Sequence, residues 1–182
     1  MEESLGKLEM KNIKKFSNEK GFYFKDMFIT PVPTFHDAVN PNGYTISDEK
    51  SKVSLITDTG WVSQEIIDAI RDSDLYFLES NYDIEMLKNG PYSWPLKQRV
   101  LSTQGHLSNE NCSEVAREIL KGNGEALVLS HLSIENNTTH LAYKNMEDTI
   151  EKMNLKVEKS VVDLDIATRF EPSRLYDLKE KK

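Results

Sequence analysis

The sequence has one cysteine, Cys112, which excludes an internal disulfide framework and fits a reducing cytoplasm. It has no apolar run of the roughly 18–20 residues that a membrane span needs, and its acidic, polar start is unlike a signal peptide. Positive charge is not in excess either, because the formal net charge is −7. This balance argues against non-specific nucleic-acid binding through a broad basic face. It does not exclude a local basic groove. We therefore expect a cytoplasmic protein without a membrane partner.

Linkers and repeats are absent as well. Glycine and proline number only 8 and 6 in 182 residues, and no Gly/Ser/Pro-rich stretch or internal repeat divides the chain. With 38% hydrophobic and 29% charged residues, the composition is typical of a globular protein. The length suits one domain with a sizeable core, so residues 1–182 are expected to form a single domain.

Strand and helix patterns alternate along most of the chain. Residues 21–33 read as two short strands, and 43–47 with 52–57 as a hairpin. Helical spacing follows at 62–71, 112–120 and 138–153, and apolar strands at 75–80, 125–130 and 155–164. This order predicts an α/β, layered architecture (α+β layered) with helices packed on a sheet.

Polar side chains collect at the ends of the predicted strands. Asp58, Glu79 and His131 stand at or just past the ends of three apolar strands, and His36 and His106 lie in loops rich in turn residues. Ligand sites of α/β proteins gather at such strand ends, since the sheet fixes the backbone and the loops can vary.

Each of these residues also has an ordinary structural explanation. Asp58, two residues before Gly60 and a helix, fits a turn or a helix cap, and a single histidine is usually a surface or core residue. Three histidines and two carboxylates together are less easily explained in that way. Imidazole and carboxylate are the ligand set of Zn²⁺, Mn²⁺ or iron, so the pattern indicates a metal site without deciding its chemistry.

Five runs of sequence carry a resemblance to a known family. They are FHDAVNPNGYTI, LITDTGWVS, LESNYDIEML, LKQRVLSTQGHLSNENC and LVLSHLSIENN, and they occur in the family's order over roughly residues 13–162. The chain resembles the C-terminal two-thirds of a metallo-β-lactamase-fold hydrolase, most nearly the YycJ/WalJ exonuclease type. Ribonuclease Z and the phosphodiesterase of phosphonate metabolism are similar to it more distantly. The resemblance implies a partial metallo-β-lactamase αβ/βα sandwich.

The resemblance also implies a two-metal site for Zn²⁺ or Mn²⁺ and a DNA or other phosphodiester substrate. His36 would bind the first metal, Asp58 would bridge both, and His131 would complete the second. His106 lies where related phosphodiesterases place a histidine that contacts the scissile phosphate or protonates the leaving group. Glu79 would orient one of these histidines. A bridging carboxylate must be held rigidly between two ions, which is a reason for Asp58 to end a strand.

Two departures from the family pattern stand out. Tyr82 occupies a position where the family often has histidine, and the family signature HxHxDH does not occur in the sequence. We therefore expect a family member that lacks its first third, with an incomplete metal site and little or no activity by itself. We also expect an open sheet edge that invites association, and a helix at 112–120 that lacks part of its packing partner.

The alternative hypothesis is a non-catalytic metallo-β-lactamase-like module that binds a partner or nucleic acid. Retention of His36, Asp58, His106 and His131 favours the hydrolase, since a binding module gains nothing from keeping them.

Overall fold

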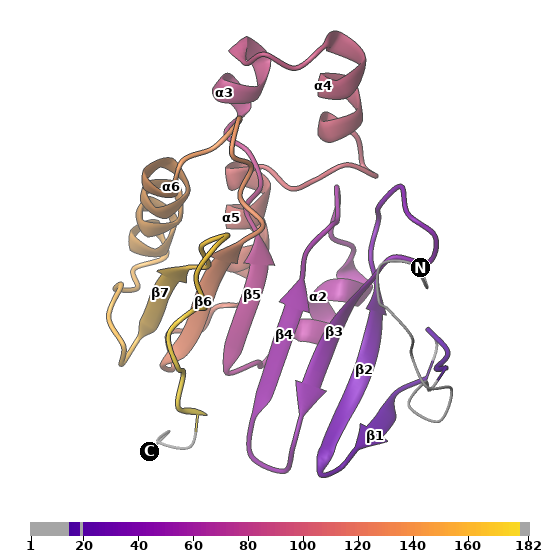
Figure 1. The fold of residues 1–182 in the computed structure, drawn as a ribbon. Coiled ribbons are helices and arrows are strands. Elements are labelled where there is room, and N and C mark those ends of the chain that lie inside the picture. Colours follow the sequence, from indigo (N-terminus) through magenta and orange to yellow (C-terminus); the bar gives the residue numbers. More distant parts are fainter. Residues whose placement is uncertain (1–14, 19, 179–182) are drawn as a thin grey trace.

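The structure is a computed structural model and describes residues 15–18 and 20–178. These residues form a seven-stranded sheet with helices on one face (Figure 1). The first fourteen residues, which carry most of the acidic start of the chain, lie outside the described part. The strands are β1 (Phe22–Phe24), β2 (Met27–Pro33), β3 (Asn42–Ser47), β4 (Lys52–Ile56), β5 (Leu75–Glu79), β6 (Glu125–Ser130) and β7 (Val162–Ile166).

The strands lie side by side in chain order. β1 to β4 form an antiparallel meander, and β4 to β7 are parallel. The predicted strand pair at 21–33 and the hairpin at 43–57 are confirmed. The last strand begins later than predicted, at Val162, because Leu155, Val157 and Val161 pack against the core from a turn instead.

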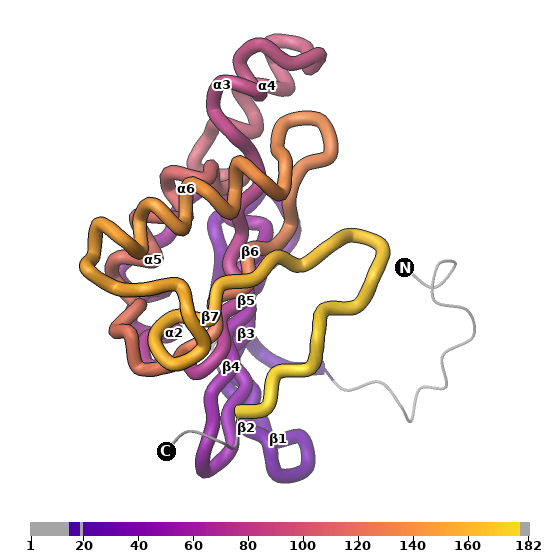
Figure 2. The backbone as a smooth tube through the Cα atoms, turned by 90° about the vertical axis from the view of Figure 1, so that its left-hand side faces the viewer, coloured from indigo at the N-terminus to yellow at the C-terminus, as the bar shows by residue number. Residues whose placement is uncertain are grey.

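Helices α2 (Gln64–Ile70), α5 (Asn109–Ile119) and α6 (Thr139–Lys152) cover one face of the sheet, as the edge-on view shows (Figure 2). Ser63, Ser108 and Thr138 cap their first turns through side-chain oxygens, which satisfies amide groups that have no partner within the helix. The expectation that the 112–120 helix would lack a packing partner is wrong. Cys112, Ala116 and Ile119 are fully buried in the core that α5 shares with α6 and the sheet.

The opposite face of the sheet carries a second, smaller apolar cluster. Leu75, Ala126 and Val128 project there, and Tyr176 and Leu178 of the C-terminal segment pack over them. Figure 2 shows this segment crossing the face opposite the helices. Because both of its faces are covered, β6 is buried along its whole length, as a central parallel strand should be.

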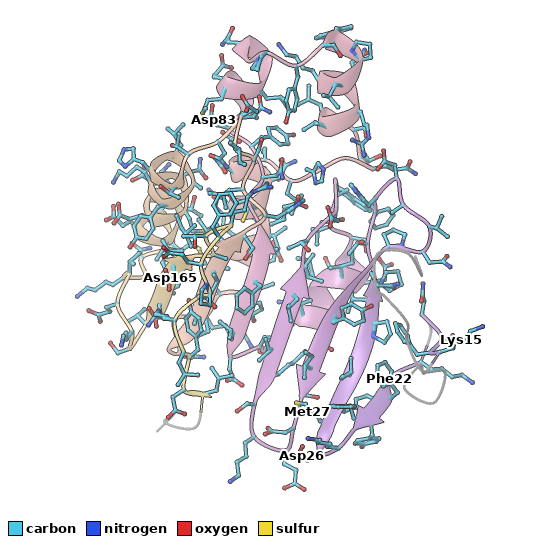
Figure 3. All side chains as sticks on the ribbon, in the orientation of Figure 1. Lys15, Phe22, Asp26, Met27, Asp83 and Asp165 are labelled. Atoms are coloured by element: carbon cyan, nitrogen blue, oxygen red, sulfur yellow. The ribbon has the colours of Figure 1, made fainter. Side chains whose placement is uncertain are left out.

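The sequence patterns miss two short helices, α3 (Ile84–Asn89) and α4 (Trp94–Leu101), which form an arm beyond the carboxyl ends of the strands (Figure 1). Figure 3 places Asp83, the cap of α3, at the base of this arm. The arm has its own small core of Tyr82, Leu87 and Val100. Tyr82, the position at which the family often has histidine, is therefore a packing residue here.

The parallel strands determine where the polar residues meet. The carboxyl ends of β4, β5 and β6 lie at one edge of the sheet. Glu79 is the last residue of β5, and Asp58 and His131 come just after β4 and β6. Among the described residues, no helix combines the length and apolar character that crossing a membrane requires.

Candidate metal centre

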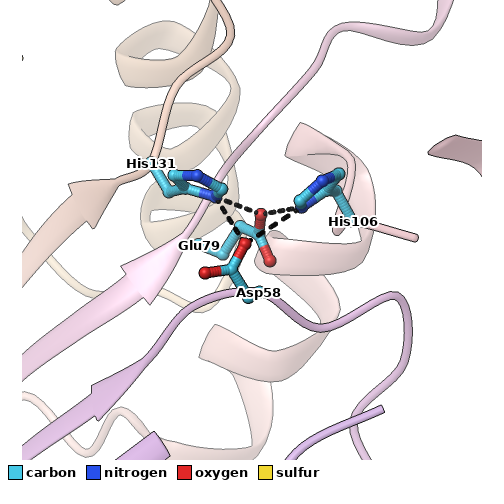
Figure 4. A group of neighbouring side chains, drawn as sticks. All are labelled: Asp58, Glu79, His106 and His131. Atoms are coloured by element: carbon cyan, nitrogen blue, oxygen red, sulfur yellow. Dashed lines mark hydrogen bonds and ion pairs between the residues drawn. The ribbon is translucent and has the colours of Figure 1, made fainter. Parts of the chain in front are cut away.

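Asp58, Glu79, His106 and His131 come together at the edge formed by the ends of β4, β5 and β6 (Figure 4). Each offers a ligand atom, and these atoms all lie within 4.8 Å of one another. No other group of this kind occurs among the described residues.

Glu79 is the buried centre of this group, with a relative exposure of 0%. Its Oε1 lies 2.7 Å from Nδ1 of both His106 and His131, and its Oε2 accepts a hydrogen bond from the Thr59 amide at 2.9 Å. The last residue of a buried parallel strand thus fixes two imidazoles and the turn that carries Asp58.

Asp58 faces the histidines from the turn after β4. Its Oδ1 lies 3.7 Å from His36 Nε2, 3.8 Å from His106 Nδ1 and 3.6 Å from His131 Nδ1. Both Asp58 and His131 have left-handed backbones, with φ of 55° and 58°. Such conformations are uncommon outside glycine and gather at functional sites, where the surrounding structure holds them in place.

His36 approaches from the loop after β2, outside the group of four. Its Nδ1 lies 2.9 Å from the carbonyl oxygen of Gly105, which requires Nδ1 to carry the proton. Its ring centroid is 4.9 Å from that of His106. In all three imidazoles Nδ1 faces an oxygen acceptor, so Nε2 is the ring nitrogen left to contact a metal or a substrate.

The charges of the group support one another. Burial raises the pKa of Glu79, but hydrogen bonds from His106 and His131 outweigh it and hold that pKa below its usual value. The hydrogen bond to Glu79 raises the pKa of His131, with further help from the charges of Glu79 and Asp58, against the opposing effects of burial and of Arg169. The centre is thus built around the anionic carboxylate of Glu79.

Several residues that the sequence patterns did not single out hold the site together. The Asn81 amide donates to the His131 carbonyl oxygen at 2.6 Å, and Thr59, fully buried, accepts from the Phe35 amide. Gly60 and Gly105 pack so closely that a Cβ at Gly60 would collide with the backbone of residues 102–105, and one at Gly105 with the backbone at the end of α4. Asn81 falls within LESN, one of the runs that carry the family resemblance, and this was the available signal.

The donor set suits a divalent cation. A buried carboxylate, a second carboxylate 49% exposed, and imidazoles with free Nε2 atoms are the ligands that Zn²⁺ and Mn²⁺ use in proteins. The structure brings together all five residues singled out in the sequence, with His36 at the edge of the group. His140, the remaining histidine, lies apart in α6.

No protein-family model matches the sequence. The protein named exodeoxyribonuclease WalJ of Streptococcus pneumoniae is 38% identical over 153 residues, 84% of this chain and 57% of that protein. Exodeoxyribonuclease YycJ of Bacillus anthracis is 34% identical over 134 residues, 74% of this chain and 51% of that protein. The chain therefore spans a little over half the length of the curated relatives it matches.

One solved structure has a fold similar to that of this chain. The metallo-β-lactamase fold protein YhfI of Bacillus subtilis superposes with a TM-score of 0.60 at 20% identity, covering 84% of this chain and 51% of its own. At this identity the likeness shows the fold alone.

Proposed function

This chain has a metallo-β-lactamase fold and is related to the exodeoxyribonucleases WalJ and YycJ, and we propose that it contributes a divalent-metal centre for hydrolysis of DNA or another phosphodiester. One observation carries the proposal: a single oxygen of Asp58 lies within 3.8 Å of ring nitrogens of three histidines, two of which a buried carboxylate orients.

The residues divide into ligands and supports. His36 and His131 would hold Zn²⁺ or Mn²⁺ through Nε2, and Asp58 would bridge two ions. The ions, when bound, supply Lewis acidity that stabilises charge on phosphoryl oxygens. Glu79 holds the Nδ1 protons of His106 and His131, which fixes both rings and directs their other nitrogens away from itself.

His106 is the proposed proton donor. Its side chain is 15% exposed, so it is shielded yet open to a substrate on one side. Because its Nδ1 is engaged by Glu79, its Nε2 is the nitrogen that could deliver a proton to the leaving oxygen of a phosphodiester. A fixed ring is what such a transfer needs.

The number of donors limits what these residues do alone. Two ions need about eight ligand positions in tetrahedral coordination, and Asp58, His36 and His131 fill only part of that set. We propose that residues 1–182 bind the ions weakly and hydrolyse slowly or not at all, and that an HxHxDH segment completes the centre.

A hydrolysis assay tests this proposal. The chain alone and a fusion that places an HxHxDH segment of a relative ahead of Met1 are compared on single-stranded DNA and on bis-p-nitrophenyl phosphate, with Mn²⁺, Zn²⁺ or a chelator. We expect clear metal-dependent hydrolysis by the fusion and little by the chain, because ligands that act on the same ions restore activity together. A fusion that is inactive yet folded and metal-loaded would favour a binding module instead.

A further inference from the structure

A cavity of about 380 Å³ opens directly beside the metal centre. Its lining includes His106 and His131, Tyr92 of the arm and Ile134 of the loop after β6. This volume lies within the range of sites that hold a small ligand, roughly 300–1,000 Å³. Any group placed in this cavity is next to the proposed proton donor.

The cavity carries one cation without a partner. Arg169 lines it, is exposed, and makes no hydrogen bond or ion pair within the part of the chain that the structure describes. Arg99, on the same lining, differs because Asp37 binds its guanidinium at 2.5 and 2.8 Å. An arginine free of carboxylates is suited to bind a phosphate, whose geometry matches the guanidinium fork.

A further space adjoins this cavity at Arg169. A second cavity of about 500 Å³ shares His131, Ile134 and Arg169 with the first and extends to Phe170. More than one group of a chain-like substrate would therefore have room next to His131. One opposing charge, Glu135, also lines the first cavity.

Resting on the proposed function, we propose that the first cavity is the subsite for the nucleotide next to the scissile phosphodiester. The Arg169 guanidinium contacts its phosphate, and the base lies against Tyr92 and Ile134. Aromatic rings bind single-stranded bases by stacking with little regard to sequence. Tyr92 suits this role because it packs on the arm's own core, which fixes the ring.

Three substitutions test the subsite, and two of them should change the affinity in opposite directions. Binding of a short fluorescein-labelled single-stranded phosphorothioate oligonucleotide, which resists hydrolysis, is measured by anisotropy in Mn²⁺ across a salt series. Arg169→Gln should weaken binding about 10-fold and flatten its salt dependence by about one phosphate contact. Glu135→Gln should tighten binding a few-fold, since it removes a repulsion. Tyr92→Leu, which keeps the apolar contact, should weaken binding about 10-fold without changing the salt dependence.

The control is Arg117→Gln, an exposed arginine on α5 that lines neither of these two cavities. It makes the same change in net charge and should leave the affinity unaltered. Equal affinities for Arg169→Gln and Arg117→Gln would overturn the subsite while leaving the hydrolase intact. Failure of the unsubstituted chain to bind the oligonucleotide would also overturn the subsite, whereas the proposed hydrolysis is tested separately on the fusion.

Discussion

Asp58→Asn is expected to weaken binding of Zn²⁺ or Mn²⁺ by at least about 100-fold and to lower hydrolysis in the completed protein by about 1,000-fold or more. The reason is the position of one oxygen, which faces His36, His106 and His131 at 3.6–3.8 Å. Asparagine keeps the shape of the side chain and removes the charge that a bridging ligand needs.

Asparagine is also the right replacement for the backbone. Asp58 has a φ of 55°, a conformation that asparagine adopts more readily than alanine, so the variant should fold as the parent does. Asp26→Asn, in the turn at the far end of the sheet (Figure 3), is the matched control. Calorimetric titration measures the metal affinity, and a hydrolysis assay measures the rate. If Asp58→Asn stays within a few-fold of Asp26→Asn in both, Asp58 is a turn former and not a ligand.

Glu79→Gln is expected to lower the free energy of unfolding of the metal-stripped chain by about 3 kcal/mol. Glu79 is wholly buried and accepts hydrogen bonds from Thr59, His106 and His131. A glutamine has a single acceptor oxygen and an amide that must itself donate, so at least one of these three donors loses its partner in the interior. Urea unfolding measures the difference, and Glu151→Gln on the exposed side of α6 is the control.

The free energy of unfolding that Glu79→Gln loses should depend on pH. The lowered pKa of Glu79 gives stability above its ordinary value of about 4.3, which is lost as pH falls through the folded value. The raised pKa of His131 gives stability below its ordinary value of about 6.5, which is lost as pH rises through the folded value. The difference between parent and Glu79→Gln should therefore be largest between about pH 4.3 and 6.5. A difference that does not vary with pH would exclude this ionic network.

The sequence predicted the strand ends that carry the site because two features agree there. Asp58, Glu79 and His131 each follow a buried apolar run, and parallel pairing of β4, β5 and β6 brings those ends to one edge. The pattern of apolar runs was enough for this prediction, without knowledge of any tertiary contact. The loop residues His36 and His106 were harder, because loops have no periodicity. Their residue type and turn-rich surroundings marked them as candidates, and only the family resemblance gave them roles.

The arm was missed for a physical reason. NGPYSWP contains two prolines and a glycine, which read as a loop, and α4 buries only Val100 of its eight residues, so it has almost no apolar periodicity. Ser93 followed by Trp94 and Pro95 was a start signal that could have indicated a helix, since proline is favoured in the first turn. The left-handed backbones of Asp58 and His131 had no sequence signal, because neither residue is glycine.

The four histidines allow the most direct test of the metal centre. Two-dimensional ¹H–¹⁵N spectra of the imidazole rings are recorded while the metal-stripped chain is titrated with Zn²⁺. Three rings, those of His36, His106 and His131, surround Asp58, and His140 in α6 is a control within the same molecule. We expect the Nε2 signals of His36 and His131 to shift with Zn²⁺ and to stop shifting when Asp58 is replaced by asparagine, while His140 is unaffected. If His140 responds equally, or if His36 and His131 do not respond as Zn²⁺ binds, these residues are not the metal centre.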